Sequence, residues 1–137
     1  MQLNTYLNFE GNCEAAFNYY ARHLGGKVAA VLKFGDSPMA ASIPAAHRDR
    51  VMHARYDVAG HTLMGTDCTP DHPYQPIRCA YIAIQLDDEA EAERIFKALA
   101  DGGNVQMPLQ QTFWAHRYGA TVDRFGVPWM VNCEKAA

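Results

Sequence analysis

The chain has 137 residues, a formal net charge of −3, 49% hydrophobic residues and 20% charged residues. A chain of this length is expected to fold as one domain, residues 1–137, without disulfide or metal staples. The negative charge provides no basic face for nucleic acid, and no apolar run approaches the roughly 20 residues of a membrane span. The polar residues 1–4 do not predict a signal peptide. We therefore expect a cytoplasmic protein with neither a nucleic-acid nor a membrane partner.

The four cysteines are scattered, and no two of them form a C-x-x-C pair; they are Cys13, Cys68, Cys79 and Cys133. This spacing does not indicate a disulfide framework or a structural zinc site. We predict reduced thiols that pack as small hydrophobic side chains.

The first half begins with a strand, because residues 2–10 alternate between two faces. One face carries Leu3, Thr5, Leu7 and Phe9, and the other carries Asn4, Tyr6, Asn8 and Glu10. Asn12 is predicted to cap a helix that begins at Cys13 and ends at the glycines 25–26. A second strand is expected over residues 27–34, followed by a loop over residues 35–50.

A hairpin is predicted over residues 51–68, with Ala59 and Gly60 as its two-residue turn. Pairing outward from this turn sets Tyr56 opposite Leu63 and Arg55 opposite Met64. The segment that follows, about residues 70–78, contains three prolines and is predicted to be a linker.

The second half repeats this order of elements. A strand is predicted over residues 79–86, and Asp88 is expected to cap the next helix in a capping box with Glu91. The apolar stripe of this helix consists of Ala92, Ile95, Phe96 and Leu99. Further strands reach residue 133, and pairing across the turn 123–126 sets Ala120 opposite Trp129 and Gly119 opposite Met130.

The repeat predicts an α+β fold of two tandem βαβββ modules that form curved antiparallel sheets around a cavity. Module one spans about residues 1–69, the linker about 70–78 and module two about 79–137. Each helix is expected on the convex face of its sheet. A small sheet cannot cover its other face alone, so a ligand would lie between the modules.

Three stretches of the sequence, residues 6–26, 52–67 and 113–129, resemble the PhnB-like branch of the vicinal oxygen chelate superfamily. This superfamily includes glyoxalase I, extradiol dioxygenases, and bleomycin- and fosfomycin-resistance proteins. The resemblance implies the fold above and a homodimer. The chain departs from the family at Arg124, where the turn more often carries proline.

Metal-dependent members of the superfamily place His or Glu at four inward positions, on the first and last strands of each module. The resemblance puts Thr5, Met64 or Thr66, Tyr81 and Met130 at these positions. None of these side chains is a usual ligand of a divalent ion, so we expect neither a metal nor a cofactor. The branch is also labelled a ubiquinone-biosynthesis methyltransferase, but the sequence has no G-x-G turn for a nucleotide cofactor.

The predicted strand faces direct two arginines, Arg55 and Arg117, into the cavity. Their planar guanidinium groups suit carboxylate, phosphate or phosphonate. We therefore hypothesise a small anionic or polar organic ligand. Alternatively, either arginine pairs with Asp57 or Asp123. The full set of predicted ligand-binding residues is Thr5, His53, Arg55, Met64, Thr66, Tyr81, Trp114, Arg117 and Met130, with Gly119, Thr121 and Asn132 also directed inward.

Two functions remain open on the sequence. The first is a metal-free protein that sequesters or carries a small molecule. The second is a metal-dependent lyase, isomerase or dioxygenase-type enzyme with ligands drawn from His53, His116, Asp67 or Glu134. Each of the two histidines is read either as a general base or as a packed polar residue.

Overall fold

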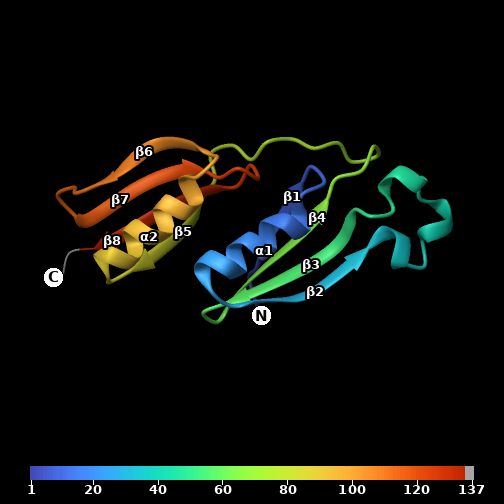
Figure 1. Cartoon of the computed structure of the whole chain (residues 1–137), viewed down its shortest axis with the longest axis horizontal. Coiled ribbons are helices and arrows are strands. Elements are labelled where there is room, and N and C mark those ends of the chain that lie inside the picture. Colours follow the sequence, from blue (N-terminus) through green and yellow to red (C-terminus); the bar gives the residue numbers. More distant parts are fainter. Residues whose placement is uncertain (135–137) are drawn as a thin grey trace. The chain divides into compact units, whose positions relative to one another are not determined.

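The computed structural model describes residues 1–134, and the chain divides into two compact units between Gln75 and Pro76. This boundary falls inside the predicted linker. Each unit contains a strand, a helix and three further strands in that order (Figure 1). The predicted α+β fold of two tandem βαβββ modules is therefore confirmed.

The first unit is a four-stranded sheet with one α-helix. Its elements are β1 (Thr5–Phe9), α1 (Cys13–Leu24), β2 (Lys27–Lys33), β3 (Val51–Val58) and β4 (His61–Asp67). The strand order is β1-β4-β3-β2, and β1 runs parallel to β4 while the other pairs are antiparallel. The sheet is thus mixed, and the expectation of purely antiparallel pairing was wrong for the first strand.

The hairpin β3–β4 has the register that its turn predicts. Tyr56 pairs with Leu63 and Arg55 with Met64. Ala59 and Gly60 both adopt positive φ, 49° and 79°, as a two-residue turn of this type requires.

The loop between β2 and β3 is ordered by short 3₁₀ turns, Phe34–Asp36, Ala40–Ser42 and Ala45–His47. Its two ends are held together by backbone hydrogen bonds. The Gly35 amide donates to the Arg48 carbonyl at 2.8 Å, and the Phe34 amide donates to the Arg50 carbonyl at 3.0 Å.

Helix α1 packs on β3 through its buried stripe of Cys13, Ala16, Phe17 and Tyr20. The Tyr56 hydroxyl of β3 donates to the Gly25 carbonyl at 2.7 Å and ties the end of the helix to the sheet. Burial raises the pKa of this hydroxyl to about 12, so it remains a donor at neutral pH.

The start of α1 is held by Asp67 and not by the predicted cap Asn12, which makes no side-chain cap bond. Asp67 Oδ1 accepts from the Cys13 amide at 2.9 Å, and Asp67 Oδ2 accepts from the Val51 amide at 2.8 Å. The carboxylate is 3% exposed. It therefore joins α1, β3 and β4 at one buried point.

The second unit repeats this plan. Its elements are β5 (Ile82–Leu86), α2 (Glu89–Ala100), β6 (Asn104–Gln110), β7 (Ala115–Val122) and β8 (Pro128–Glu134). The strand order is β5-β8-β7-β6, with β5 parallel to β8 and the other pairs antiparallel. Strand β5 begins three residues later than predicted.

Helix α2 starts as the sequence predicts. The Asp88 side chain accepts from the Ala90 and Glu91 amides, and the predicted stripe of Ala92, Ile95, Phe96 and Leu99 is buried. The Glu91 carboxylate pairs with Arg94.

The predicted register of the last hairpin was wrong by one residue. Ala120 pairs with Met130, and Thr121 pairs with Trp129. Asp123 causes the shift: its Oδ1 accepts from the Phe125 and Val127 amides, each at 2.9 Å, and so holds one additional residue in the loop. A slip of one residue exchanges the two faces of a strand.

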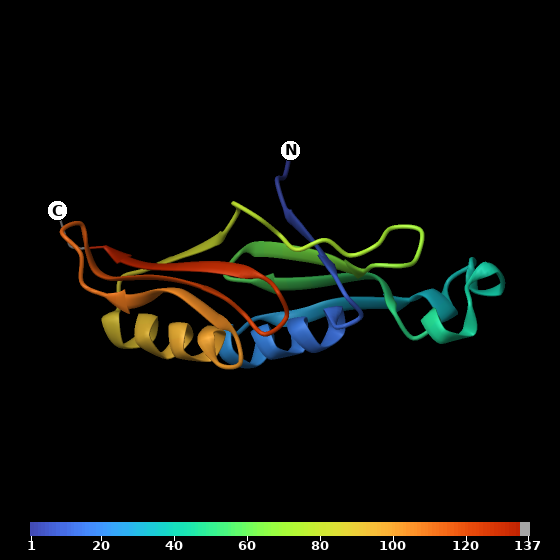
Figure 2. The ribbon, with the colours of Figure 1, turned by 90° about the horizontal axis from the view of Figure 1, so that it is seen from above.

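Each helix covers one face of its own sheet (Figure 2). Within residues 1–134, the opposite face of each sheet carries no helix. In the same residues, no helix is both long and apolar enough to cross a membrane.

Candidate functional site

The open face of the first sheet is the face that points away from α1. Gly65 lies on the helix side, because a Cβ added there would be 2.9 Å from Cys13 Sγ and from Phe17 Cζ. Residues that alternate with Gly65, and their strand partners, therefore point the other way. The first open face consists of Tyr6, Asn8, His53, Arg55, Asp57, Thr62, Met64 and Thr66.

Arg55 lies on this face but already has a partner. Its Nε donates to Asp57 Oδ1 at 2.9 Å, and the Thr62 hydroxyl donates to the same oxygen at 2.7 Å. The hydrogen bond from Arg55, followed by that from Thr62, lowers the pKa of Asp57. The alternative that the sequence left open, a pair with Asp57, is the arrangement that the structure has.

Thr5 does not belong to the first open face. It pairs with Leu63 and alternates with the buried Leu7, so it has the parity of the helix side. The residues of β1 on the open face are Tyr6, opposite Met64, and Asn8, opposite Thr66. The alternation of residues 2–10 already separated these two faces, so this alternation was the signal for Tyr6 and Asn8.

Tyr6 and His53 form the aromatic part of the first open face. Their ring centroids are 6.0 Å apart, and Tyr6 is 47% exposed. Nearby, the Thr66 hydroxyl donates to the Met52 carbonyl at 2.8 Å. Thr66 therefore offers a lone pair, and not a proton, to anything that binds there.

The open face of the second sheet is defined in the same way. A Cβ added to Gly119 would be 2.9 Å from Phe96 Cε2 of α2, so Gly119 lies on the helix side. The second open face consists of Ala83, Gln85, Met107, Tyr118, Ala120, Met130 and Asn132. Met130 and Asn132 lie on this face as predicted, and Thr121 does not.

Arg117 was predicted to point inward, and this was wrong. Its Nε lies 3.0 Å from Glu93 Oε1, and one terminal nitrogen lies 3.1 Å from Glu89 Oε1. Both carboxylates belong to α2, so Arg117 is on the helix side. The register shift at Asp123 is the cause, because it moves the odd-numbered residues of β7 to that side.

Tyr81 precedes β5 and reaches across the second open face. Its hydroxyl lies 2.6 Å from Gln106 Oε1 on β6, to which it donates a hydrogen bond. Strands β5 and β6 are opposite edges of the sheet. Neighbouring strands lie roughly 4.8 Å apart, so this link crosses roughly 14 Å of the sheet. The two side chains therefore lie along the open face.

Trp114 and Asn132 stand toward the other end of this face. The Trp114 ring is 5.3 Å from the Tyr118 ring, and Trp114 is 43% exposed. Asn132 is opposite Tyr118 and Gln85 in the sheet register. Its Nδ2 donates to Glu134 Oε1 at 3.3 Å, whereas its Oδ1 is buried without a hydrogen-bond partner among the described residues.

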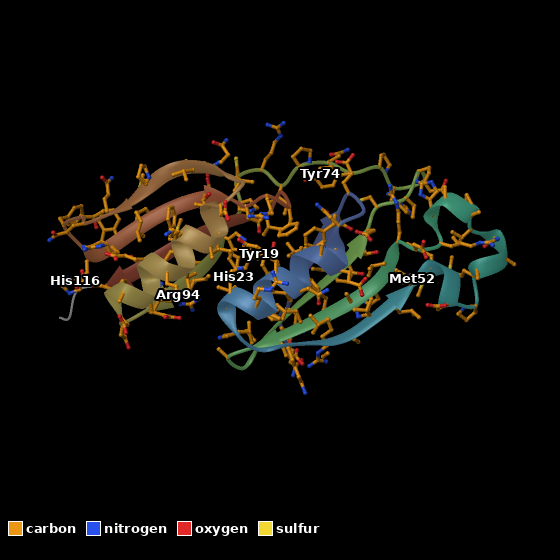
Figure 3. All side chains as sticks on the ribbon, in the orientation of Figure 1. Tyr19, His23, Met52, Tyr74, Arg94 and His116 are labelled. Carbon is orange, nitrogen blue, oxygen red and sulfur yellow. The ribbon has the colours of Figure 1, made fainter. Side chains whose placement is uncertain are left out.

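Neither open face fits a divalent metal ion. Phenol, amide, thioether and hydroxyl groups dominate both faces, whereas such ions favour several carboxylates or imidazoles. Among residues 1–134, no group of three or more His, Cys, Asp or Glu side chains is placed to hold a metal. Asp67, one of the alternative ligands, is used by the Cys13 and Val51 amides. His116 lies at the start of β7 (Figure 3).

Three of the four thiols are poor nucleophiles. Burial is the main cause that raises the pKa of Cys13, Cys68 and Cys133. Cys79 is exposed, and all four cysteines are free thiols.

Similarity to known proteins covers nearly the whole chain. Residues 1–132 match the family described as 3-demethylubiquinone-9 3-methyltransferase. Protein YjdN of Escherichia coli is 35% identical over 147 residues, with 98% of this chain and 97% of that protein covered. Protein PA1353 from Pseudomonas aeruginosa has a solved structure with a TM-score of 0.90 and 51% identity, and 99% of each chain is covered.

More distant structures share the fold. A putative 3-demethylubiquinone-9 3-methyltransferase, PhnB protein, from Bacillus cereus has a TM-score of 0.83 at 22% identity, covering 97% of this chain and 99% of that one. A mutant of the fosfomycin resistance protein FosX from Listeria monocytogenes, solved with Mn(II) and a dihydroxypropylphosphonic acid, has a TM-score of 0.68 at 10% identity. It covers 98% of this chain and 93% of its own.

Proposed function

The chain belongs to the 3-demethylubiquinone-9 3-methyltransferase family, the PhnB-like branch of the glyoxalase/bleomycin resistance/dioxygenase superfamily, and on that premise we propose that it binds a small polar organic molecule. The observation that carries the proposal is that each sheet leaves one face without a helix and presents mixed aromatic, amide and thioether side chains there. The second open face has the composition that is typical of ligand sites in proteins, mostly apolar with a few polar groups.

We further infer that the chain, residues 1–137, forms one cytoplasmic domain, that the ligand binds on an open face, and that the protein acts as a homodimer. The exposure of large apolar side chains supports binding on these faces, because Tyr6 is 47%, Met107 41% and Trp114 43% exposed. Contiguous exposed apolar surface on a small protein commonly marks an interface or a ligand site.

We propose that the ligand is polar. Fewer observations support a strongly anionic ligand. The two arginines were the predicted anion-binding groups, and a guanidinium group binds an anion through N–H donors that are not already engaged. The Arg55 Nε is bonded to Asp57, and Arg117 is bonded to Glu89 and Glu93. An anion would therefore bind beside a carboxylate that already pairs with the same guanidinium group.

The proposal includes neither a resident metal nor methyl transfer. The open-face side chains do not match the donors that a divalent ion prefers. The strand-to-helix turns, residues 10–12 and 87–88, contain no G-x-G that would admit a nucleotide cofactor. Within residues 1–134, neither sheet by itself brings together three side chains that could hold a metal for the superfamily's metal-dependent chemistry.

A fragment screen with matched variants tests the proposal. Amides, amines, carboxylates and phosphonates are screened by thermal shift against the wild type, Met64→Arg, Met130→Arg and the loop control Met39→Arg. A ligand at ten times its Kd stabilises a protein by about 1.4 kcal/mol, which such a screen detects. We expect hits that disappear in at least one open-face variant and persist in the control, because Met39 is an exposed loop residue.

Hits that persist equally in all three variants would contradict the proposed location. Metal content is measured on the same protein, purified without chelator. One equivalent of Zn, Ni, Mn or Fe would contradict the metal-free part of the proposal.

A further inference from the structure

We infer that Asn132 anchors the ligand through its side-chain carbonyl, and that the ligand therefore presents an N–H or O–H donor attached to a flat ring. This inference rests on the proposed function and adds the chemical class of the ligand. It depends on three features of the second open face: an unpaired acceptor, its fixed orientation and the aromatic side chains beside it.

The acceptor is Oδ1 of Asn132. Asn132 is 7% exposed, and this oxygen has no hydrogen-bond partner among the described residues. Buried polar atoms are nearly always paired, so an unpaired one calls for a partner that the chain itself does not supply. Asn132 lies on the open face and not toward α2, because it alternates with the buried Val131 and Cys133 of β8.

The orientation of the amide follows from Glu134. A carboxylate only accepts hydrogen bonds, so the amide nitrogen must face Glu134 Oε1, at 3.3 Å. Exchange of the oxygen and the nitrogen would place two acceptors against each other. The free atom of Asn132 is therefore the oxygen, and a partner must donate to it.

The neighbouring side chains select for a ring. Tyr118 is directly opposite Asn132 in the register, and the Trp114 ring meets the Tyr118 ring edge to face at 5.3 Å. Phe113 adds a further ring 4.8 Å from Trp114 and is 90% exposed. Aromatic side chains of this kind pack well against planar groups.

Charge completes the selection. The side chains that define the second open face include neither Lys nor Arg, and Arg117 is held on the helix side by Glu89 and Glu93. Gln85 stands beside Asn132 and offers an amide, and Glu134 offers a carboxylate, which only accepts hydrogen bonds. The side chains around Asn132 thus favour a ligand with a neutral or cationic donor. A carboxylate ligand would face the oxygens of Asn132 and Glu134 and no cation.

The ligand's donor reaches Oδ1 when a side chain that covers this atom changes its rotamer. Oδ1 has essentially no accessible surface in this conformation. Rotamer changes of partly exposed side chains take nanoseconds or less, much faster than a ligand exchanges. A site that hydrogen-bonds its ligand discriminates strongly against an analogue without the donor, because its polar group then stays unpaired.

Benzamide and benzoate form a matched pair of probes, since they have the same ring and nearly the same shape. Benzamide has an N–H donor, and benzoate has acceptors alone. Binding of both is measured by NMR titration with wild type, Asn132→Leu and the control Asn18→Leu, which places the same change on an exposed position of α1. The side-chain amide resonance of Asn132 is followed in the wild type.

We expect benzamide to bind the wild type and Asn18→Leu at least tenfold more tightly than benzoate, and to shift the Asn132 amide resonance. Asn132→Leu should lose at least tenfold in benzamide affinity while its melting temperature stays equal or rises. The reason is that an apolar group of similar size removes an acceptor that the folded chain leaves unpaired.

Three results would overturn the inference: tighter binding of benzoate, unchanged benzamide affinity in Asn132→Leu, or a benzamide complex that leaves the Asn132 amide resonance unshifted. The last result is measured on the wild type and stands even if Asn132→Leu does not fold. Benzoate binding alone on an open face would overturn the inference and leave the proposed function intact. If neither benzamide nor benzoate binds and the fragment screen gives no hit, the inference and the proposed function are both overturned.

Discussion

Asp67 is predicted to be a structural clamp, and its removal should destabilise the first unit strongly. The carboxylate is 3% exposed and accepts two backbone hydrogen bonds, from the Cys13 amide at 2.9 Å and the Val51 amide at 2.8 Å. Substitution Asp67→Ala leaves both buried N–H groups without a partner. Each unsatisfied group costs about 1–3 kcal/mol, so we expect a loss of about 3–5 kcal/mol in the free energy of unfolding.

Far-UV circular dichroism during urea and thermal unfolding measures this loss. At this chain length the loss corresponds to a fall in Tm on the order of 10 °C. Asp67→Asn should lie between Ala and wild type, because its amide keeps one acceptor and sets a donor against the other N–H group. The exposed linker residue Asp71 provides the control, and Asp71→Ala should change stability by less than about 0.5 kcal/mol.

A loss below about 1 kcal/mol in Asp67→Ala would refute this account of the clamp. If the variant instead kept its stability and lost a bound metal ion, Asp67 would be the metal ligand that the alternative function requires.

Three further predictions follow from packing and burial. Gly65→Ala should lower the free energy of unfolding in urea by about 1–3 kcal/mol, because the added Cβ would lie 2.9 Å from two side-chain atoms of α1. A change below about 0.5 kcal/mol would contradict that packing. With a thiol reagent at pH 8, the exposed Cys79 should react in a fast phase that the substitution Cys79→Ser removes. Cys13 should react on unfolding alone, because burial raises the pKa of its thiol, and fast labelling of Cys13 in the native protein would contradict this. Arg117→Gln should lower the free energy of unfolding by about 0.5–1 kcal/mol, because it removes the ion pairs with α2. Fragment binding in the thermal-shift screen should stay unchanged, and a loss of binding would show that Arg117 belongs to the ligand site.

The two hairpins show how far the sequence determines register. In the first, Ala59 and Gly60 form a two-residue turn that fixes the pairing, and the prediction was correct. In the second, the loop holds one residue more because the Asp123 carboxylate accepts from the Phe125 and Val127 amides. The pattern of apolar residues fits either loop length, so periodicity alone could not choose between them.

This difference of one residue explains why the predicted position of Arg117 was wrong. Arg117 moved to the helix side, where Glu89 and Glu93 of α2 bind it. Both partners lie more than 20 residues away in sequence, and a local pattern contains no information about such pairs. The sequence correctly predicted that Asn132 points to the open face. That its Oδ1 has no partner among the described residues follows only from the positions of the neighbouring side chains.

Helix starts differ in the same way. Asp88 caps α2 from the adjacent position, and the sequence pattern identified it. The start of α1 is held by Asp67, which is 54 residues from Cys13, so the local rule selected Asn12 instead. Thr5 was a different kind of error, because the alternation of β1 already assigned it to the side of Leu7.

The central claim, that the ligand binds on the open faces, is tested most directly by NMR of protein labelled at the methionine methyl groups. Met64 lies on the first open face, Met107 and Met130 lie on the second, and Met39 in the loop serves as an internal reference. Fragment hits from the thermal-shift screen are titrated into the labelled protein. We predict that the Met64, Met107 or Met130 methyl resonances shift in a saturable manner while that of Met39 does not. Saturable shifts confined to Met39, or binding that leaves all three open-face methyl resonances unchanged, would contradict it.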